Sequence, residues 1–203
     1  MNGNKTPNKL SKREREELAA VSEELHKKDG AYQKRANFEF FIYLVVTFLA
    51  VFALRQYVGE PVRVDGPSMN NTLLNDERMI VEKISYLFRA PKRGEIITCY
   101  YPGYDVSCVK RVIGLPGETV EIIHGVTYID GEPLDESEWI AEPMWDYSFE
   151  AVTVPENCVF VMGDNRNYSK DSRDETVGCI PFQRIVGHAA AVIWPLDKIR
   201  GLG

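Results

Sequence analysis

The chain has 203 residues, with 24 Lys and Arg against 30 Asp and Glu, so its formal net charge is 24 − 30 = −6. Hydrophobic residues make up 44% of the chain and charged residues 27%, a balance that excludes wholesale disorder. An acidic chain argues against a nucleic-acid partner, which selects a basic surface. Four Cys without a C-x-x-C spacing and three His argue against a structural zinc site, and no motif indicates another metal or a cofactor.

The first 37 residues are polar and basic, unlike the rest of the chain. They hold nine Lys or Arg and six Asp or Glu, a net charge of 9 − 6 = +3, which leaves −6 − 3 = −9 for the residues that follow. High charge and few aromatic residues predict a disordered or loosely helical tail over residues 1–37. Leu18, Val21 and Leu25 recur at helical spacing, so a short solvated helix is the alternative.

Residues 38–58 form an apolar segment. The stretch from Phe38 to Leu54 reads FEFFIYLVVTFLAVFAL, with Glu39 as its one charged residue. It reaches roughly 25 Å as a helix, and residues up to 58 extend it toward the ~30 Å hydrocarbon core of a membrane. The absence of a polar face argues against a buried core helix, and the 37 residues before it argue against a cleavable signal peptide. Val51-Phe-Ala53 resembles a cleavage site, so removal stays open, but we expect a retained transmembrane anchor.

The charged residues beside this anchor predict its orientation. Four basic residues lie just before it and two follow it closely: Lys27, Lys28, Lys34 and Arg35, then Arg55 and Arg63. The end of a transmembrane helix that is flanked by more Lys and Arg residues stays in the cytoplasm. We therefore expect a single-pass protein of the cell membrane with a cytoplasmic tail (residues 1–37) and an extracytoplasmic domain (residues 59–203).

Residues 59–203 show the pattern of an antiparallel β domain. Short runs of β-branched and aromatic residues alternate with Pro and Gly turns. Asp130-Gly131 between two alternating runs predicts a tight hairpin. We expect a mainly β fold, a folded-over antiparallel barrel or sandwich behind one transmembrane helix, with one hairpin and a loop between Thr119 and Pro155. The expected strands are Val62–Val64, Met79–Glu82, Glu95–Thr98, Val106–Ile113, Thr119–Ile123, Thr127–Ile129, Val159–Val161 and Ala189–Trp194.

Three stretches of this domain contain polar residues in arrangements that a β scaffold alone does not require. They supply a Ser beside a Gly-Pro turn, a Lys inside an apolar strand, and a dense polar loop after another apolar run. The stretches are Gly66-Pro-Ser-Met-Asn-Asn-Thr-Leu73, Val109-Lys-Arg-Val-Ile-Gly-Leu-Pro-Gly-Glu118 and Met162-Gly-Asp-Asn-Arg-Asn-Tyr-Ser-Lys-Asp-Ser-Arg173.

A serine hydroxyl needs a base before it acts as a nucleophile at neutral pH. His26, His124 and His188 stand in no catalytic motif and there is no G-x-S-x-G, so a Ser-His-Asp triad is poorly supported. A lysine serves as the base when burial lowers its pKa from about 10.4. Lys110 has apolar neighbours, and strand alternation places it and Arg111 on opposite faces, so one of the two can point inward.

Together the three stretches resemble the bacterial type I signal peptidases, over roughly residues 38–198. Three boxes in the family's order behind a membrane anchor are far more specific than any one box. The resemblance implies a membrane-bound serine endopeptidase with a Ser/Lys dyad, which contacts membrane lipid and removes signal peptides from secreted preproteins. The matching residues are Ser68-Met69-x-x-Thr72-Leu73, Lys110-Arg111-Val112-Ile113-Gly114-x-Pro116-Gly117, and Gly163-Asp164-Asn165-Arg166 with Ser169-x-Asp171-Ser172-Arg173.

The resemblance also implies roles for single residues. Ser68 is the expected nucleophile and Lys110 the expected general base. Ser169 is expected to hydrogen-bond and orient the lysine. Four charged residues of the third box are expected to support the site, the last two as an ion pair: Asp164, Arg166, Asp171 and Arg173.

The oxyanion hole and the substrate contacts are expected close to the same residues. The backbone N–H of Ser68 is one expected oxyanion donor. Some relatives supply a hydroxyl two residues earlier, where this chain has Gly66, so the second donor, a backbone N–H or a water, stays open. An extended peptide is expected along strand edges, with small side chains in shallow apolar pockets beside Met69, Val109 and Cys108.

Two further features leave alternatives open. Asn71 stands where most relatives have Pro, which removes a fixed φ from the serine turn. All four cysteines fall on the expected outer side, where one or two disulfides can form, although a small buried Cys108 beside the dyad is the preferred interpretation. The four are Cys99, Cys108, Cys158 and Cys179.

Three other functions compete with this one. A self-cleaving Ser/Lys regulator is opposed by the membrane segment and by the lack of a helix-turn-helix module. An inactive anchored β domain that binds partners is opposed by the intact set of Ser68, Lys110 and Ser169. A specialised signal peptidase that serves one pilin or surface-fibre locus is not separated by the sequence from a general one.

Overall fold

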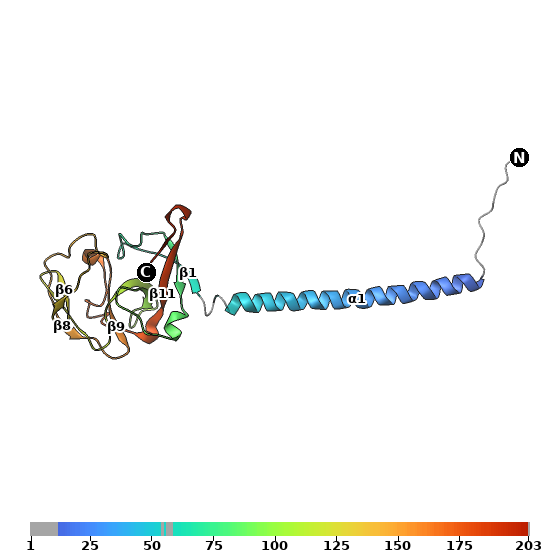
Figure 1. Ribbon diagram of the computed structural model, residues 1–203, viewed down its shortest axis with the longest axis horizontal. Helices are drawn as coiled ribbons and strands as arrows, with labels where there is room; N and C mark the ends of the chain where they lie inside the picture. Colours follow the sequence, from blue (N-terminus) through green and yellow to red (C-terminus); the bar gives the residue numbers. More distant parts are fainter. Residues whose placement is uncertain (1–11, 54, 56–58, 203) are drawn as a thin grey trace. The chain divides into compact units, whose positions relative to one another are not determined.

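The computed structural model describes residues 12–53, 55 and 59–202, and the chain divides into two units, Met1–Phe52 and Ala53–Gly203. The first unit contains one continuous helix, α1 (Lys12–Ala53), drawn in blue in Figure 1. A regular helix therefore replaces the disordered or loosely helical tail that the composition favours, from residue 12 onward. Ion pairs one turn apart support it, Arg13 with Glu17 at 3.3 Å and Arg35 with Glu39 at 2.9 Å. Residues 1–11 of the tail lie outside the described part.

The second half of α1 is long and apolar enough to cross a membrane. This stretch, Tyr32–Ala53, has 22 residues and a mean hydropathy of 2.0, and none of its most apolar window is buried. Its one acidic residue, Glu39, pairs with Arg35 near the start of the stretch. Residues 54 and 56–58 of the expected anchor are not among the described ones.

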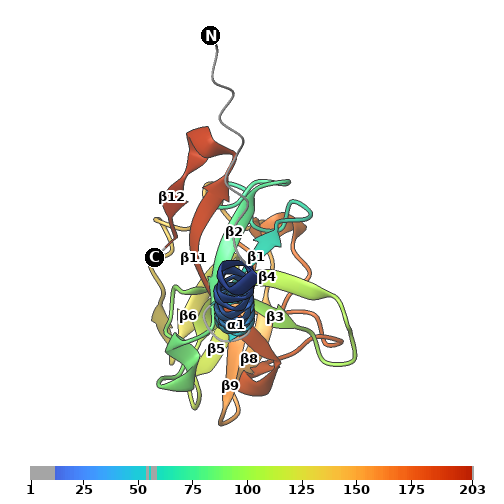
Figure 2. The ribbon, with the colours of Figure 1, turned by 90° about the vertical axis from the view of Figure 1, so that its right-hand side faces the viewer.

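The second unit contains two antiparallel sheets, and the larger has eight strands (Figures 1 and 2). Seven follow the order β1-β2-β11-β3-β4-β9-β10, and β12 pairs with β11. Four short 3-10 helices lie in the connections: η2 (Ser85–Leu87), η3 (Arg166–Tyr168), η4 (Phe182–Arg184) and η5 (Leu196–Lys198). The strands are β1 (Gly59–Arg63), β2 (Arg78–Glu82), β3 (Ile96–Tyr100), β4 (Ser107–Gly114), β9 (Cys158–Met162), β10 (Ile180–Pro181), β11 (Ile185–Trp194) and β12 (Arg200–Gly201).

The smaller sheet has four strands in the order β7-β6-β5-β8. Its two-residue turns use left-handed backbone, His124-Gly125 at φ 47° and 80° and Asp130-Gly131 at φ 52° and 83°, as hairpins of this length require. The expected single hairpin with a loop is therefore wrong, because β7 and β8 complete a sheet. The strands are β5 (Thr119–Ile123), β6 (Val126–Ile129), β7 (Glu132–Pro133) and β8 (Phe149–Thr153).

Three apolar clusters fill the domain and join the two sheets. Ile113, Phe160 and Met162 of the larger sheet pack with Val120 and Ile122 of the smaller one, so the sheets share a core. The prediction of a mainly β, antiparallel fold behind one apolar helix is confirmed.

Strand β4 is covered on both faces from its middle to its end. The residues Lys110 and Arg111 are 3% and 5% exposed although their side chains point to opposite faces. Both cations therefore point inward, where the sequence pattern required only one to do so. Strand β4 therefore contains two adjacent basic residues that are both removed from solvent.

Candidate active site

Ser68 lies in the connection between β1 and β2, residues 64–77. Gly66 enters it at φ 91°, a conformation that favours glycine, and its N–H donates to Asn75 Oδ1 at 2.9 Å. Farther along, the Leu73 N–H donates to the carbonyl of Met69 at 2.8 Å. The backbone on both sides of Ser68 is thus held by hydrogen bonds within the connection.

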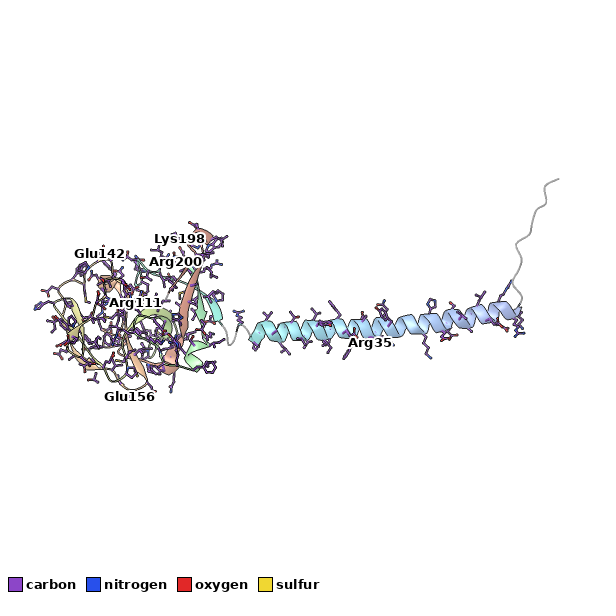
Figure 3. All side chains as sticks on the ribbon, in the orientation of Figure 1. Arg35, Arg111, Glu142, Glu156, Lys198 and Arg200 are labelled. Carbon is purple, nitrogen blue, oxygen red and sulfur yellow. The ribbon has the colours of Figure 1, made fainter. Side chains whose placement is uncertain are left out.

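A second set of hydrogen bonds braces the same connection from the C-terminal strand. Arg200 in β12 donates to the Thr72 carbonyl and to the buried Glu77 carboxylate, each at 2.7 Å. Figure 3 labels Arg200 beside the end of the domain formed by β11 and β12. The connection that contains Ser68, called the serine turn below, is therefore held to strand β12 of the larger sheet by these hydrogen bonds.

The structure brings the Ser68 and Lys110 side chains into direct contact. Lys110 Nζ lies 2.8 Å from Ser68 Oγ and donates a second hydrogen bond to the Val109 carbonyl at 2.9 Å. These distances are those of normal hydrogen bonds between a nitrogen and an oxygen. A nitrogen base at this distance can accept the serine proton without rearrangement.

Burial lowers the pKa of Lys110 below that of an exposed lysine. Four groups that face the amine oppose this effect in part, namely Cys108, Asp171, Cys99 and Asp164. Desolvation exceeds their combined attraction, because the amine is almost wholly removed from water. A lysine in this position is neutral over a wider pH range than an exposed one.

The loop between β9 and β10 lies directly against the serine turn. The Asn165 N–H donates to the Ser68 carbonyl at 3.1 Å. Asp171, buried in this loop, accepts the Gly163 N–H at 2.9 Å and pairs with Arg173 Nε at 2.7 Å. The structure therefore places the expected ion pair of Asp171 and Arg173 within the loop that supports Ser68.

A buried ion pair joins this loop to β4 and to the serine turn. Asp164 accepts Arg111 Nε at 2.7 Å and Arg111 Nη2 at 2.6 Å, and it also accepts the Thr72 hydroxyl at 2.5 Å. The Arg111 guanidinium stacks 5.1 Å from the ring centre of Trp139 and lies inside the domain in Figure 3. One carboxylate thus connects the three boxes of the sequence.

A second buried ion pair holds the start of the same loop. Arg166 donates two hydrogen bonds of 2.6 Å to Glu136, which lies in the connection between β7 and β8. The same guanidinium donates to the Gly163 carbonyl at 3.1 Å. Arg166 therefore ties the loop to the β7–β8 connection, and among the described residues it makes no hydrogen bond with Ser68 or Lys110.

Four expected contacts differ in the structure. Ser169 Oγ is buried without a hydrogen-bond partner among the described residues, so it does not bond Lys110. The Gly66 N–H, the backbone candidate for the second oxyanion donor that the sequence left open, donates to Asn75 instead. Met69 is 1% exposed and belongs to the core, so its side chain lines no open pocket. Cys108 packs with the cluster on the other face of β4 from Val109, so the two side chains do not share one pocket.

Two residues of the site were not predicted as functional from the sequence. Arg111 belongs to the lysine motif, which assigns it no role of its own, yet it is the partner of Asp164. Glu136 stands in a segment with no motif and was not considered, because its partner Arg166 is 30 residues away. Strand alternation was the sequence feature that could indicate an inward-pointing Arg111. No sequence feature indicates a role for Glu136.

The serine turn also differs from the proline pattern of the family. Asn71 adopts φ 83°, which proline cannot reach because its ring fixes φ near −65°. Asparagine tolerates this left-handed conformation better than most residues. The turn at Asn71 is therefore built on asparagine geometry.

In the described part of the catalytic domain, neither His124 nor His188 makes a hydrogen bond with Ser68 or Lys110. His124 is exposed in the β5–β6 turn, with Nδ1 2.8 Å from Asp146 Oδ1, and His188 lies in β11 opposite Glu82. His26 lies in α1. Among residues 12–53, 55 and 59–202, no group of three His, Cys, Asp or Glu side chains is arranged to hold a metal ion.

Gly163 faces Ser169 Oγ and the Ser68 carbonyl so closely that a Cβ there would overlap both. Replacing Gly163 by Ala is expected to shift the Ser68 turn and to lower kcat/KM for peptide cleavage by about 10-fold or more, since small misplacements are costly in catalysis. Steady-state kinetics check this, with Gly201→Ala as the control because a Cβ there meets nothing. Equal kinetics of both variants and the parent would contradict the close contact.

Known proteins similar to this chain belong to one family. The family described as signal peptidase, peptidase S26, matches residues 37–194. A probable signal peptidase I-1 of Synechocystis sp. is 44% identical over 79% of this chain and 84% of that protein. Signal peptidase I S of Bacillus subtilis is 34% identical over 86% of this chain and 98% of that protein. A crystal structure of a signal peptidase I from Enterococcus faecalis gives a TM-score of 0.42 at 34% identity, covering 50% of this chain and 98% of that one. This chain therefore belongs to the signal peptidase I family of serine peptidases, peptidase S26.

Proposed function

We propose that this protein is a membrane-anchored endopeptidase that cleaves signal peptides from secreted preproteins, with Ser68 as nucleophile and neutral Lys110 as general base. The contact of 2.8 Å between Lys110 Nζ and Ser68 Oγ carries this assignment. Burial of the lysine and its lowered pKa support it independently, because a base must be unprotonated before the reaction begins.

The reaction follows from this contact. The Lys110 amine takes the Ser68 proton as Oγ attacks the scissile carbonyl, and the ammonium then protonates the departing amine. The Val109 carbonyl, 2.9 Å from Nζ, accepts a hydrogen bond from the charged form. In the second half, the neutral amine removes a proton from the water that hydrolyses the acyl-enzyme. Ser169 is proposed to act by filling space beside Gly163.

The Ser68 backbone amide is proposed as an oxyanion donor. Its N–H has no hydrogen-bond partner among the described residues, unlike that of Gly66. An unengaged donor beside the nucleophile is what a developing negative charge requires.

The substrate peptide is proposed to lie across Ser68, where it contacts apolar residues of the protein at one end and polar residues at the other. Val62 and Val109, half-buried at the edge of one core cluster, offer shallow apolar contacts for small signal-peptide side chains. A polar hollow of about 170 Å³ is lined in part by Asn70, Asn165 and Glu142, the last labelled in Figure 3. The first residues of the mature protein are proposed to leave through this hollow.

The membrane arrangement is part of the same proposal. Residues 1–37 are proposed to lie in the cytoplasm, residues 38–58 to anchor the chain, and residues 59–203 to act outside the membrane. The apolar stretch of α1 and the excess of basic residues before it support this orientation.

The activity is expected to rise with pH through the lowered pKa of Lys110. The protonated lysine is inactive, so kcat/KM increases as the amine loses its proton, at a pH below the ordinary value of about 10.4 for lysine. A pH profile of kcat/KM measures this. A profile governed by a group near the histidine reference of about 6.5, and abolished in His124→Ala or His188→Ala, would contradict the lysine base.

A cleavage assay tests the proposed function. The full-length protein in detergent is mixed with a secreted preprotein that carries Ala at the last and third-last positions of its signal peptide, and the new N-terminus is read by mass spectrometry. Cleavage at the signal junction is expected, with loss of cleavage when the last position carries Phe. A folded parent that cleaves no preprotein of a diverse panel would contradict a general signal peptidase, and cleavage of one class alone would assign a specialised one.

A further inference from the structure

Two cysteines face each other across neighbouring strands beside Lys110. Cys99 in β3 and Cys108 in β4 are register partners, and both are free thiols. Their sulfur atoms lie 3.6 Å apart, and Cys108 Sγ is 3.3 Å from the Cys99 carbonyl oxygen. Neither thiol has a part in the proposed cleavage reaction. The pair is therefore a nucleophilic cluster without an assigned use.

We propose that Cys99 and Cys108 form a modification site, a dithiol that a small or protein disulfide oxidises to a cross-strand disulfide next to the catalytic lysine. The proposal rests on the proposed function in one respect, because residues 59–203 must lie outside the membrane, where disulfides persist.

The register permits this bond with little movement. Directly opposed residues of an antiparallel pair have Cβ atoms about 4.5–5.5 Å apart, and a disulfide needs about 3.5–4.5 Å. A small approach of β3 and β4 with side-chain rotation is therefore sufficient. Cys158 and Cys179 also lie near each other, but no contact joins their sulfurs, so they serve as a natural comparison.

The two thiols differ in a way that sets the order of the reaction. Cys108 is half-buried, and the hydrogen bond with Cys99, helped by Tyr101 and the Lys110 charge, lowers its pKa. Cys99 is fully buried, and its pKa is raised, first by the hydrogen bond with Cys108 and then by burial. The accessible sulfur with the lower pKa attacks first in thiol–disulfide exchange.

The exchange proceeds in two balanced steps. The Cys108 thiolate attacks one sulfur of the oxidant's disulfide, forms a mixed disulfide and releases one thiolate of the oxidant. Cys99 then loses its proton to that thiolate and attacks Cys108 Sγ, and the second thiolate of the oxidant departs. The protein loses two hydrogen atoms and two thiols become one disulfide, while the oxidant's disulfide becomes two thiols.

The bond changes the surroundings of Lys110. Cys108 lies two residues before Lys110 on the same face of β4, and its negative charge is the largest influence that raises the lysine pKa. Cys99, Asp171 and Asp164 also face the amine and act in the same direction. The raised pKa of Cys99 keeps that thiol protonated and uncharged, whereas Cys108 acts on the lysine in its thiolate form. A disulfide carries no charge, so oxidation removes the charge of the Cys108 thiolate and leaves the two carboxylates. The oxidised protein therefore has a neutral lysine at lower pH.

The modification is tested by mass, without any cleavage assay. The full-length protein in detergent is equilibrated with oxidised and reduced glutathione, alkylated and digested with trypsin. Peptide 94–110 contains both cysteines. It is expected to lose two hydrogen atoms under oxidation and to remain free of alkylation. The double variant Cys158→Ala/Cys179→Ala is expected to behave in the same way.

Single variants test the order of attack. Cys99→Ala is expected to keep glutathione attached to Cys108, because the resolving thiol is gone, whereas Cys108→Ala is expected to leave Cys99 unmodified. Near-UV circular dichroism checks that both variants are folded. Free thiols in the oxidised parent, a bond between Cys158 and Cys179 alone, or glutathione on Cys99 would overturn the site.

The effect on the lysine is tested by the pH profile. At a pH one unit below the midpoint of the reduced protein, the oxidised parent is expected to cleave about threefold faster or more, and Cys108→Ala, which has no thiol to oxidise at that position, to show the same midpoint with and without the oxidant. An unchanged midpoint would overturn the link to Lys110. The mass readout needs no activity, so a parent that forms the bond but cleaves nothing would refute the proposed function and not the site.

Discussion

Replacing Ser68 by Ala is expected to lower kcat for signal-peptide cleavage by at least about 10⁴-fold, because the attacking oxygen is gone. Ser68 is half-buried at a turn held by backbone hydrogen bonds, so the variant is expected to stay folded. Single-turnover cleavage of a preprotein measures the loss. A folded Ser68→Ala protein with parental activity would refute the nucleophile.

Replacing Lys110 by Met is expected to cost about 10³-fold or more in kcat, and also to increase the free energy of unfolding at pH 7. The folded protein lowers the pKa of Lys110, so the unfolded chain binds more protons between the two pKa values, and the buried amine destabilises the fold at every pH below about 10.4. This penalty shrinks as the pH rises through the range between the two pKa values. Met removes it, which separates the effect of a lost base from that of a damaged fold.

Chemical denaturation measures the second half of this prediction. Lys110→Met is expected to lose its advantage over the parent as the pH approaches the unfolded pKa of lysine, about 10.4. A variant that is both inactive and less stable than the parent at pH 7 would show that Lys110 supports the fold instead.

A large effect on stability is expected at the buried pair of Arg111 and Asp164. Arg111→Gln leaves the Asp164 carboxylate buried without its cation, and the free energy of unfolding is expected to fall by about 3–5 kcal/mol. Equilibrium unfolding in urea measures this. Arg63→Gln is the matched control, because Arg63 also pairs with an aspartate, Asp76, but both side chains are exposed. The control is expected to unfold as the parent does.

A double replacement sharpens the same test. Arg111→Leu with Asp164→Leu removes both charges, so it is expected to destabilise less than Arg111→Gln alone. Cleavage is expected to fall in the double variant even where stability recovers, because Asp164 also holds the Thr72 hydroxyl of the serine turn at 2.5 Å. Equal stability of the parent and Arg111→Gln would contradict a role for this pair in the fold.

The strands that carry strong local patterns could be predicted from the sequence. The expected run Met79–Glu82 became β2, and Asp130-Gly131 formed the left-handed hairpin turn. Strand β8 was missed because its burial does not alternate, so it carries no period-two signal. For the charged tail the sequence left a disordered or loosely helical stretch and a short solvated helix as alternatives, and the structure has a regular helix from residue 12, supported by ion pairs one turn apart such as Arg13 with Glu17.

The same difference between local patterns and long-range contacts decides which residues of the site the sequence could predict. Ser68 and Lys110 stand in motifs, so the sequence could single them out, although only the fold brings their side chains to 2.8 Å. Glu136 and Arg166 meet across 30 residues, and no local pattern encodes such a contact. The Ser169 hydroxyl was expected on the lysine and has no partner, because a side-chain rotamer is not written in a motif.

The acyl-enzyme tests the central claim most directly. The full-length protein is mixed with a preprotein, quenched with acid within one turnover, digested with trypsin and analysed by mass spectrometry. The signal-peptide fragment is expected as an ester on peptide 64–78, which contains Ser68, and it is expected to be absent in Lys110→Met. A fragment attached to another residue, or an ester on Ser68 that forms at the parental rate without Lys110, would contradict the Ser68–Lys110 dyad.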